Sequence, residues 1–150
     1  MDDLLMRRAT IDDIPAIVAM LSDDPLGAAR EAEAGHPSYT LAFKEIDADP
    51  HQTLAVGERG GEVVACLQLT VIPGLSRQGA KRALIEAVRV RSDQRGSGLG
   101  KRLIEWAIEE ARARGCVMVQ LTTDKSRLDA HRFYLSLGFT DSHIGMKLAL

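Results

Sequence analysis

Val88-Arg89-Val90-Arg91-Ser92-Asp93-Gln94-Arg95-Gly96-Ser97-Gly98-Leu99-Gly100-Lys101 is the stretch that decides the fold, because it joins a strand to a helix through a glycine-rich turn. In such a turn, successive backbone N–H groups converge on an anion, and the helix dipole adds partial positive charge. Glycine lets the backbone approach a ligand closely. The stretch therefore predicts a ligand that carries phosphate.

Charge is concentrated around the same stretch. Residues 77–102 have an excess of +6, although the formal net charge of the whole chain is −2. This local field attracts anions, whereas the slightly acidic total argues against a general nucleic-acid binder or a membrane-surface protein. The basic side chains are Arg77, Lys81, Arg82, Arg89, Arg91, Arg95, Lys101 and Arg102, against the acids Glu86 and Asp93.

Two familiar phosphate-binding motifs do not fit this loop. A P-loop read back from Gly100-Lys101 needs glycine where Arg95 stands, and Ser or Thr where Arg102 stands. A dinucleotide-binding fingerprint read from Gly96 and Gly98 needs a third glycine where Lys101 stands. An ATPase, a kinase or a nicotinamide enzyme is therefore disfavoured.

Hydrophobic periodicity and turn residues predict the elements on both sides. In the helix over 98–114, the side chains expected to face inward are Leu99, Leu103, Trp106, Ala107 and Ala111. Thr10 and Asp13 form a capping-box pattern at the start of the first helix. The predicted series is a strand over 4–9, a helix after Thr10, a short helix or loop over 26–36, a helix over 38–48, a hairpin over 52–57 and 62–72, a strand over 80–91, the helix over 98–114, a central strand over 116–121, a helix over 128–137 and a last strand or hairpin over 139–150.

The chain has 150 residues, of which 45% are hydrophobic and 27% charged, as expected for one globular domain over residues 1–150. The element order fits a mixed α/β sheet with helices on both faces. Two cysteines make no disulfide framework and show no zinc spacing, and no apolar run is long enough to span a membrane. We therefore expect a soluble, cytoplasmic protein without a metal centre.

Two motifs resemble the GNAT superfamily of N-acetyltransferases. Arg95-Gly96-Ser97-Gly98-Leu99-Gly100 resembles that family's Arg/Gln-x-x-Gly-x-Gly/Ala loop, and residues 129–139 (Asp-Ala-His-Arg-Phe-Tyr-Leu-Ser-Leu-Gly-Phe) resemble its Ala-x-x-Phe-Tyr-x-x-x-Gly-Phe segment. Their separation and the element order match over nearly the whole chain. The last thirty residues are also similar to aminoalkylphosphonate acetyltransferases. The resemblance implies a mostly antiparallel central sheet, splayed between its fourth and fifth strands, with helices on both faces.

The resemblance also implies acetyl-coenzyme A as the cofactor. Main-chain groups of Val88 and Val90 would pair with the pantetheine arm, the Val88 amide would polarise the thioester carbonyl, and the glycine-rich loop would hold the pyrophosphate. Arg127 stands where family members often carry Asn, which puts one pantetheine contact in question. The residues implied in cofactor binding are Val88, Arg89, Val90, Arg95, Gly96, Ser97, Gly98, Leu99, Gly100, Lys101, Arg127, Ala130 and Phe133.

Tyr134 and Glu86 are the candidate catalytic residues. The motif position of Tyr134 makes it the general acid beside the leaving thiolate; the alternative is an aromatic that only packs in its helix. Strand alternation places Glu86 on the same side as Val88 and Val90, where its carboxylate would hold the substrate ammonium or accept its proton, directly or through water. The alternative for Glu86 is a structural ion pair with a nearby arginine.

The acceptor is less well defined by the sequence. His131, His143 and Tyr39 are candidate substrate contacts, and residues 26–40 and 73–79 are the expected walls of the pocket. The implied reaction moves an acetyl group to a primary amine of a small molecule by direct attack in a ternary complex. Neither cysteine lies in the motif region, so we expect no acyl-cysteine intermediate.

Two other functions remain open at this point. One is a coenzyme A-binding or sensing module without catalysis, and the other is a protein Nα- or lysine acetyltransferase. The resemblance allows a homodimer, but the sequence fixes neither the oligomeric state nor the identity of the amine.

Overall fold

The computed structural model describes residues 3–150, and its contacts divide the chain into two units, Met1–Gln120 and Leu121–Leu150, which we describe separately. The prediction of a single domain stays a prediction. Apart from two short 3-10 turns, Ile11–Asp13 and Ser92–Gln94, the first unit contains β1 (Leu5–Arg8), α1 (Ile14–Leu21), α2 (Pro25–Arg30), α3 (Pro37–Ala48), β2 (Gln52–Arg59), β3 (Glu62–Ile72), α4 (Ser76–Gly79), β4 (Lys81–Val90), α5 (Leu99–Ala113) and β5 (Cys116–Gln120).

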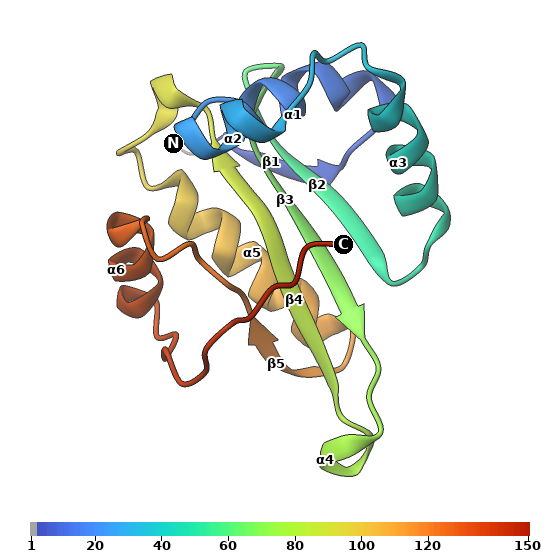
Figure 1. Ribbon diagram of the computed structural model, residues 1–150, viewed down its shortest axis with the longest axis vertical. Coiled ribbons are helices and arrows are strands. Elements are labelled where there is room, and N and C mark those ends of the chain that lie inside the picture. Colours follow the sequence, from blue (N-terminus) through green and yellow to red (C-terminus); the bar gives the residue numbers. More distant parts are fainter. Residues whose placement is uncertain (1–2) are drawn as a thin grey trace. The chain divides into compact units, whose positions relative to one another are not determined.

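The strands of the first unit form one sheet in the order β1-β2-β3-β4-β5 (Figure 1). The first three pairings are antiparallel, and β4 pairs with β5 in parallel. This arrangement confirms the predicted mostly antiparallel sheet and the predicted hairpin. The expectation that 116–121 is a central strand is wrong: β5 is the last strand in the order, and Val117 is 72% exposed. An apolar run indicates a strand but does not say which neighbours it has.

Helices cover both faces of this sheet (Figure 1). On one face, α1 and α3 pack against alternate residues of β2 and β3, because side chains two apart along a strand share a face. That core contains Ile14, Ile17, Val18, Met20, Phe43, Val56 and Cys66. The opposite face carries Ala55, Leu67, Leu69 and Ile85, and α5 covers it with Leu99, Leu103, Ile104, Ala107 and Ala111. Trp106, expected inside, is only half-buried, and Ile104 is buried in that helix instead.

The entry to α1 is held by a fully partnered acid. The Thr10 N–H donates to Asp13 Oδ2 at 2.7 Å, as the capping-box pattern predicts. Arg7 Nη1 and Nη2 donate to the same carboxylate at 2.7 and 3.0 Å, and Arg7 Nε donates to Glu58 at 2.7 Å. The Arg7 guanidinium thereby holds the pKa of the buried Asp13 carboxyl below its usual value.

The second unit contains α6 (Leu128–Ser136), close to the helix predicted over 128–137. The strand or hairpin expected over 139–150 is absent: within the described chain, that segment forms neither helix nor strand. Its apolar residues recur with the period of a strand, but Ile144, Met146 and Leu148 are 79%, 90% and 86% exposed. Alternating apolar residues indicate which side chains a strand could bury. A strand also needs a neighbouring strand to pair its backbone N–H and C=O groups, and alternation does not supply one.

Candidate functional site

The candidate site is built on the half of β4 that leaves its neighbour. β4 pairs with β5 from Lys81 to Leu84 and then continues alone on that side to Val90. Among the strands of residues 3–150, none pairs with this side of Glu86–Val90. The predicted splaying between the fourth and fifth strands is confirmed.

A β-bulge lies where β4 becomes open. Opposite residues run Cys66 with Arg89 and then Gln68 with Glu86, so one residue of β3 faces two of β4. Ala87 has a φ of 53°, a left-handed conformation that costs about 1–2 kcal/mol for a residue with a side chain. A bulge re-aims the strand that carries it. Strain at this point sits beside the open half of β4, as it often does at functional sites.

The bulge overturns the alternation argument for Glu86. Glu86 lies opposite Gln68, and Arg89 lies opposite Cys66, so these four residues share the face that α1 covers. Val90 lies opposite Ala65, on the other face. Glu86 therefore shares a face with Arg89 and not with Val90. The extra residue shifts the period-two pattern, and the sequence shows no sign of it.

Glu86 is exposed, and within residues 3–150 it forms no ion pair. Solvent reaches the Glu86 carboxylate, so the charge has no burial cost that a partner would have to offset. The alternative of a structural ion pair with an arginine has no support in the described structure either. An exposed carboxylate beside the bulge remains available to an amine.

The open half of β4 presents backbone groups on its free side. The Arg91 N–H donates to Val64 O at 2.8 Å, so Ala65 and Val90 form the pair that makes no hydrogen bonds between strands. In an antiparallel ladder the N–H and C=O of such a residue point away from the partner strand. The Val90 groups therefore point away from β3.

Two arginines donate to the open-edge carbonyls. Arg89 Nη1 donates to Val88 O at 2.8 Å, and Arg95 Nε donates to Val90 O at 3.3 Å. The sequence-predicted residues Val88, Arg89, Val90 and Arg95 are thus brought together at one edge. The carbonyl oxygens of Val88 and Val90 therefore accept hydrogen bonds from side chains of the same protein.

The glycine-rich loop leads from this edge into α5. Gly96 and Gly98 have φ values of 78° and 82°, which residues with a Cβ rarely adopt. Gly98 is the N-cap of α5, and Leu99 behind it is buried. The first N–H groups of a helix have no partner within it, so those of Leu99, Gly100 and Lys101 end the loop as donors. The predicted strand, turn and helix N-terminus are confirmed.

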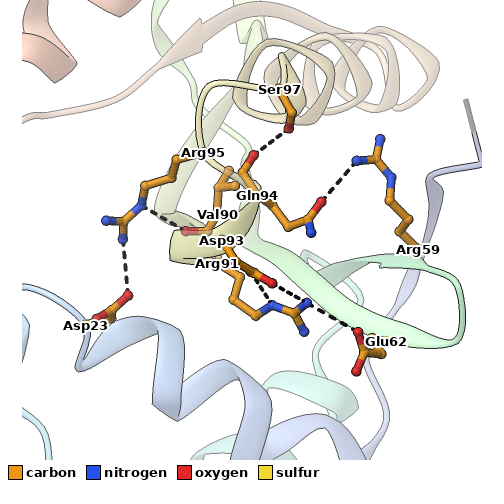
Figure 2. A network of polar contacts seen from close by, with 9 residues as sticks. All are labelled: Asp23, Arg59, Glu62, Val90, Arg91, Asp93, Gln94, Arg95 and Ser97. Carbon is orange, nitrogen blue, oxygen red and sulfur yellow. Dashed lines mark hydrogen bonds and ion pairs between the residues drawn. The ribbon is translucent and has the colours of Figure 1, made fainter.

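A polar network fixes the shape of the loop (Figure 2). Ser97 Oγ donates to Gln94 O, and the Gln94 side-chain oxygen accepts from Arg59 Nη1 at 3.1 Å. The Arg91 guanidinium donates two hydrogen bonds to the Asp93 carboxylate, at 2.6 and 2.9 Å, and one to the Glu62 carboxylate at 3.3 Å. Side chains of β2 and β3, together with the loop's own residues, therefore hold the loop in this conformation.

The positive field expected over residues 77–102 is partly neutralised by acids from elsewhere. Asp23 lies 3.4 Å from Arg95, Asp24 lies 3.8 Å from Arg89, and Glu62 pairs with Arg91. Counting charges within one stretch of sequence misses such partners. Asp23 and Asp24 are also the residues near the site that sequence reasoning did not select, although Asp24-Pro25 carries the signal of a helix start.

The second unit holds the remaining predicted residues. Tyr134 makes edge-to-face contacts with Phe133 and Phe139, at centroid distances of 5.2 and 5.8 Å. His131 Nε2 lies 3.3 Å from Asp141 Oδ2, and His143 contacts Ser142. Arg127 is the residue before α6, and Ala130 lies in its first turn. These contacts show how the side chains pack, and the roles of Tyr134, His131 and His143 stay predictions.

Tyr39, expected at the substrate, has a clear local role. Its hydroxyl donates to Glu31 Oε1 at 2.9 Å and accepts from the Ala32 N–H at 2.9 Å. Burial raises the pKa of the Tyr39 hydroxyl. The side chain therefore ties residues 31–32 to α3. The other expected pocket wall, residues 73–79, contains α4, where Arg77 and Gln78 adopt left-handed conformations.

One cysteine lies closer to the site than we expected. Cys66 sits opposite Arg89, and its Sγ lies 3.7 Å from Ala87 O at the bulge. Burial raises the pKa of the Cys66 thiol to about 12, so the thiolate is scarce near neutral pH. The chemistry of the thiol, not its distance, is what argues against a nucleophilic cysteine.

The described part of the chain has neither a metal-binding cluster nor a membrane-spanning helix. Residues 3–150 contain no group of three or more His, Cys, Asp or Glu side chains that could hold a metal ion. No helix over the same residues has the length and apolar character needed to cross a membrane.

Comparison with known proteins agrees with the geometry. The model of the acetyltransferase (GNAT) family matches residues 15–139. Aminoalkylphosphonate N-acetyltransferase of Salmonella typhimurium is 31% identical over 145 residues, covering 97% of this chain and 90% of that protein. Glucosamine 6-phosphate N-acetyltransferase of Trypanosoma brucei brucei is 37% identical over 90 residues, or 60% of this chain and 59% of that protein. The structure of a transcriptional regulator from Bacillus halodurans C-125 is 49% identical, with a TM-score of 0.93, covering 98% of this chain and 99% of that one.

Proposed function

The chain belongs to the acetyltransferase (GNAT) family, and from that premise we propose that it transfers an acetyl group from acetyl-coenzyme A to the primary amine of a small molecule. The observation that carries the proposal is the open half of β4, which ends at a loop and helix N-terminus rich in N–H donors. An extended arm with amide groups fits the first feature, and a pyrophosphate fits the second.

The residues present fit this cofactor. Val88 and Val90 offer backbone groups at a strand edge that no described strand occupies. Gly96 and Gly98 let the loop turn, and a Cβ built on either would meet nothing within 4 Å, which leaves room above the loop. Arg95 and Lys101 add positive charge beside that room. Acetyl-coenzyme A supplies an acetyl group that is activated as a thioester.

The chain's own groups divide the chemistry between them. The Val88 amide would donate to the thioester oxygen, where negative charge develops during the attack. Glu86 accepts a proton from the substrate ammonium, so that the neutral amine attacks the carbonyl carbon. As the carbon–sulfur bond breaks, Tyr134 would donate its phenolic proton to the leaving sulfur. The attacking nitrogen would lose its remaining extra proton to water, and the Tyr134 phenolate would regain a proton from water. The products are the N-acetylated amine and the free thiol of coenzyme A.

For the acceptor, we propose a small primary amine that also carries a phosphonate or phosphate group. The names of two relatives combine these features: an aminoalkylphosphonate has an amine and a phosphonate, and glucosamine 6-phosphate has an amine and a phosphate. Polyamines and amino acids are the comparison substrates that lack the phosphorus group.

The test measures release of free coenzyme A thiol from acetyl-coenzyme A across a panel of these amines and of peptides. Turnover with a phosphonate- or phosphate-bearing amine, reduced at least tenfold in Tyr134→Phe and in Glu86→Gln, is the expected result. Turnover with peptides alone would replace the small-molecule acceptor by a protein one. Binding of acetyl-coenzyme A without any turnover would leave a coenzyme-binding module, and no binding at all would overturn the cofactor assignment.

A further inference from the structure

The turn between α1 and α2 reaches both arginines of the open β4 edge. It carries Asp23 and Asp24 side by side. Asp23 Oδ2 accepts a hydrogen bond from Arg95 Nη2 at 3.4 Å. Figure 2 draws this contact. Asp24 Oδ2 lies 3.8 Å from Arg89 Nε. A pair of acids from the start of the chain therefore faces the pair of arginines that donate to Val88 O and Val90 O.

This turn is a built feature of the fold. Asp24 is the N-cap of α2, and its Oδ1 accepts from the Gly27 N–H at 2.5 Å. Gly27 is buried, and a Cβ at this position would lie 1.8 Å from the carbonyl oxygen of Leu21. Only glycine allows α2 to approach the end of α1 this closely. The position of the two acids is therefore set by backbone contacts.

The Arg95 guanidinium makes two contacts, one from Nε and one from Nη2. Nε donates to Val90 O, and Nη2 contacts Asp23. The Val90 carbonyl is one of the acceptors that an amide of the pantetheine arm would need. Arg95 therefore contacts an acceptor that the proposed cofactor would use, and Asp23 contacts the other side of the same guanidinium.

We propose that Asp23 is a positioning residue that acts through Arg95, holding the guanidinium on the Val90 carbonyl until a diphosphate group takes it over. The inference rests on the proposed function, because it takes the loop over residues 95–101 as the diphosphate site. When the guanidinium turns to the diphosphate, Val90 O becomes free for the arm. Binding of the diphosphate and binding of the arm are thereby coupled.

The expected effect is modest, because the contact is in solvent. The side chains of Arg95 and Asp23 are 53% and 49% exposed. Exposed ion pairs change an equilibrium by about 1.5- to 5-fold. Removing the Asp23 charge should therefore tighten the binding of acetyl-coenzyme A by about that factor at low salt. The gain should shrink as salt screens the charges.

The first test compares dissociation constants of acetyl-coenzyme A by calorimetry for the wild type, Asp23→Asn and Glu62→Gln. Glu62→Gln is the matched control: it also removes one negative charge near the loop, but its partner Arg91 does not donate to Val88 O or Val90 O. The inference predicts tighter binding in Asp23→Asn than in the control. Equal or weaker binding in Asp23→Asn would overturn it.

The second test separates the two halves of the cofactor. Pantetheine supplies the arm and ADP supplies the diphosphate. In the wild type, saturating ADP should strengthen pantetheine binding. In Asp23→Asn, pantetheine alone should bind more tightly and ADP should add less. Independent binding of the two fragments in the wild type would contradict the exchange of Arg95.

Kinetics distinguish this inference from a general structural effect and from failure of the proposed function. Asp23→Asn should lower KM for acetyl-coenzyme A and leave KM for the amine unchanged. If the wild type binds acetyl-coenzyme A but the variant shows no gain, the inference alone is wrong. If the wild type binds neither acetyl-coenzyme A nor ADP, both the inference and the proposed function are wrong.

Discussion

The two halves of β4 belong to one strand but have different surroundings. From Lys81 to Leu84, β4 has a neighbour on each side. From Glu86 to Val90, it pairs with β3 alone, and the bulge at Ala87 separates the two halves. The first half carries fully buried side chains such as Ala83, whereas the second is half-buried or exposed throughout. Buried packing is concentrated in the paired half, and the backbone edge without a strand partner is in the open half.

The largest effect on the free energy of unfolding should come from Ile85, which lies between the two halves of β4. Ile85 is 2% exposed and lies opposite Leu69 beneath α5. Ile85→Ala should lower the free energy of unfolding by about 2–5 kcal/mol, because it removes buried methyl groups and leaves a cavity. Urea unfolding measures this loss. Val90→Ala is the control in the open half, and an equal loss there would contradict the division of the strand.

At the opposite edge of the sheet, the buried carboxylate of Asp13 accepts hydrogen bonds from Arg7 and from the Thr10 N–H. It provides a comparison with the exposed, open half of β4. Asp13→Asn should cost about 1–3 kcal/mol, since it breaks the contact with Arg7. Because folding lowers the pKa of Asp13, its carboxylate stabilises the protein fully above the unfolded pKa of about 4 and loses this contribution as pH falls through the lower folded value. Unfolding measured from pH 7 to pH 2 should therefore show less acid sensitivity in Asp13→Asn than in the wild type.

In the glycine-rich loop that follows the open half of β4, two glycine variants should distinguish a loss of stability caused by backbone strain from a loss of cofactor binding. Gly98→Ala places a side chain at a φ of 82° and should cost about 1 kcal/mol of stability. Gly60→Ala, in the β2–β3 turn at a φ of 59°, should cost a similar amount. Only Gly98→Ala should also weaken acetyl-coenzyme A binding, since only that residue lies at the proposed diphosphate site. Equal affinities of the two variants for acetyl-coenzyme A would argue against the glycine-rich loop as the diphosphate site.

The smallest effect on stability should come from the open half itself. Glu86 is exposed and forms no ion pair within residues 3–150, so Glu86→Gln should change the free energy of unfolding by less than about 0.5 kcal/mol. Thermal unfolding checks this value. A loss of more than about 1 kcal/mol would mean that Glu86 has a structural partner, and its catalytic role would then need another explanation.

Much of the architecture could be predicted from the sequence, because local signals specify it. The run from Val88 to Lys101 specified a strand, a turn and a helix, and Thr10 and Asp13 specified the start of a helix. The bulge at Ala87 could not be predicted, since alanine carries no preference for a positive φ. It is imposed by the pairing with β3, and it decided the face on which Glu86 lies.

The errors at the C-terminal end have a related cause. Strand periodicity over 139–150 and the apolar run after Gly115 were visible, but which strand neighbours which is a property of the whole sheet. The acids that face Arg89 and Arg95 were missed for the same reason, because Asp23 and Asp24 lie more than sixty residues away in sequence. Residue types could be assigned to a site from motifs, whereas their partners could not.

The most direct test of the central claim is amide hydrogen exchange along β4, read residue by residue by NMR with and without acetyl-coenzyme A. If the arm binds along the open edge, the cofactor should slow exchange at Val88 and Val90 and leave Lys81–Leu84 unchanged, because those residues already have a neighbour on each side. Binding of acetyl-coenzyme A without added protection at Val88 and Val90 would contradict the assignment of the open half of β4 as the cofactor site.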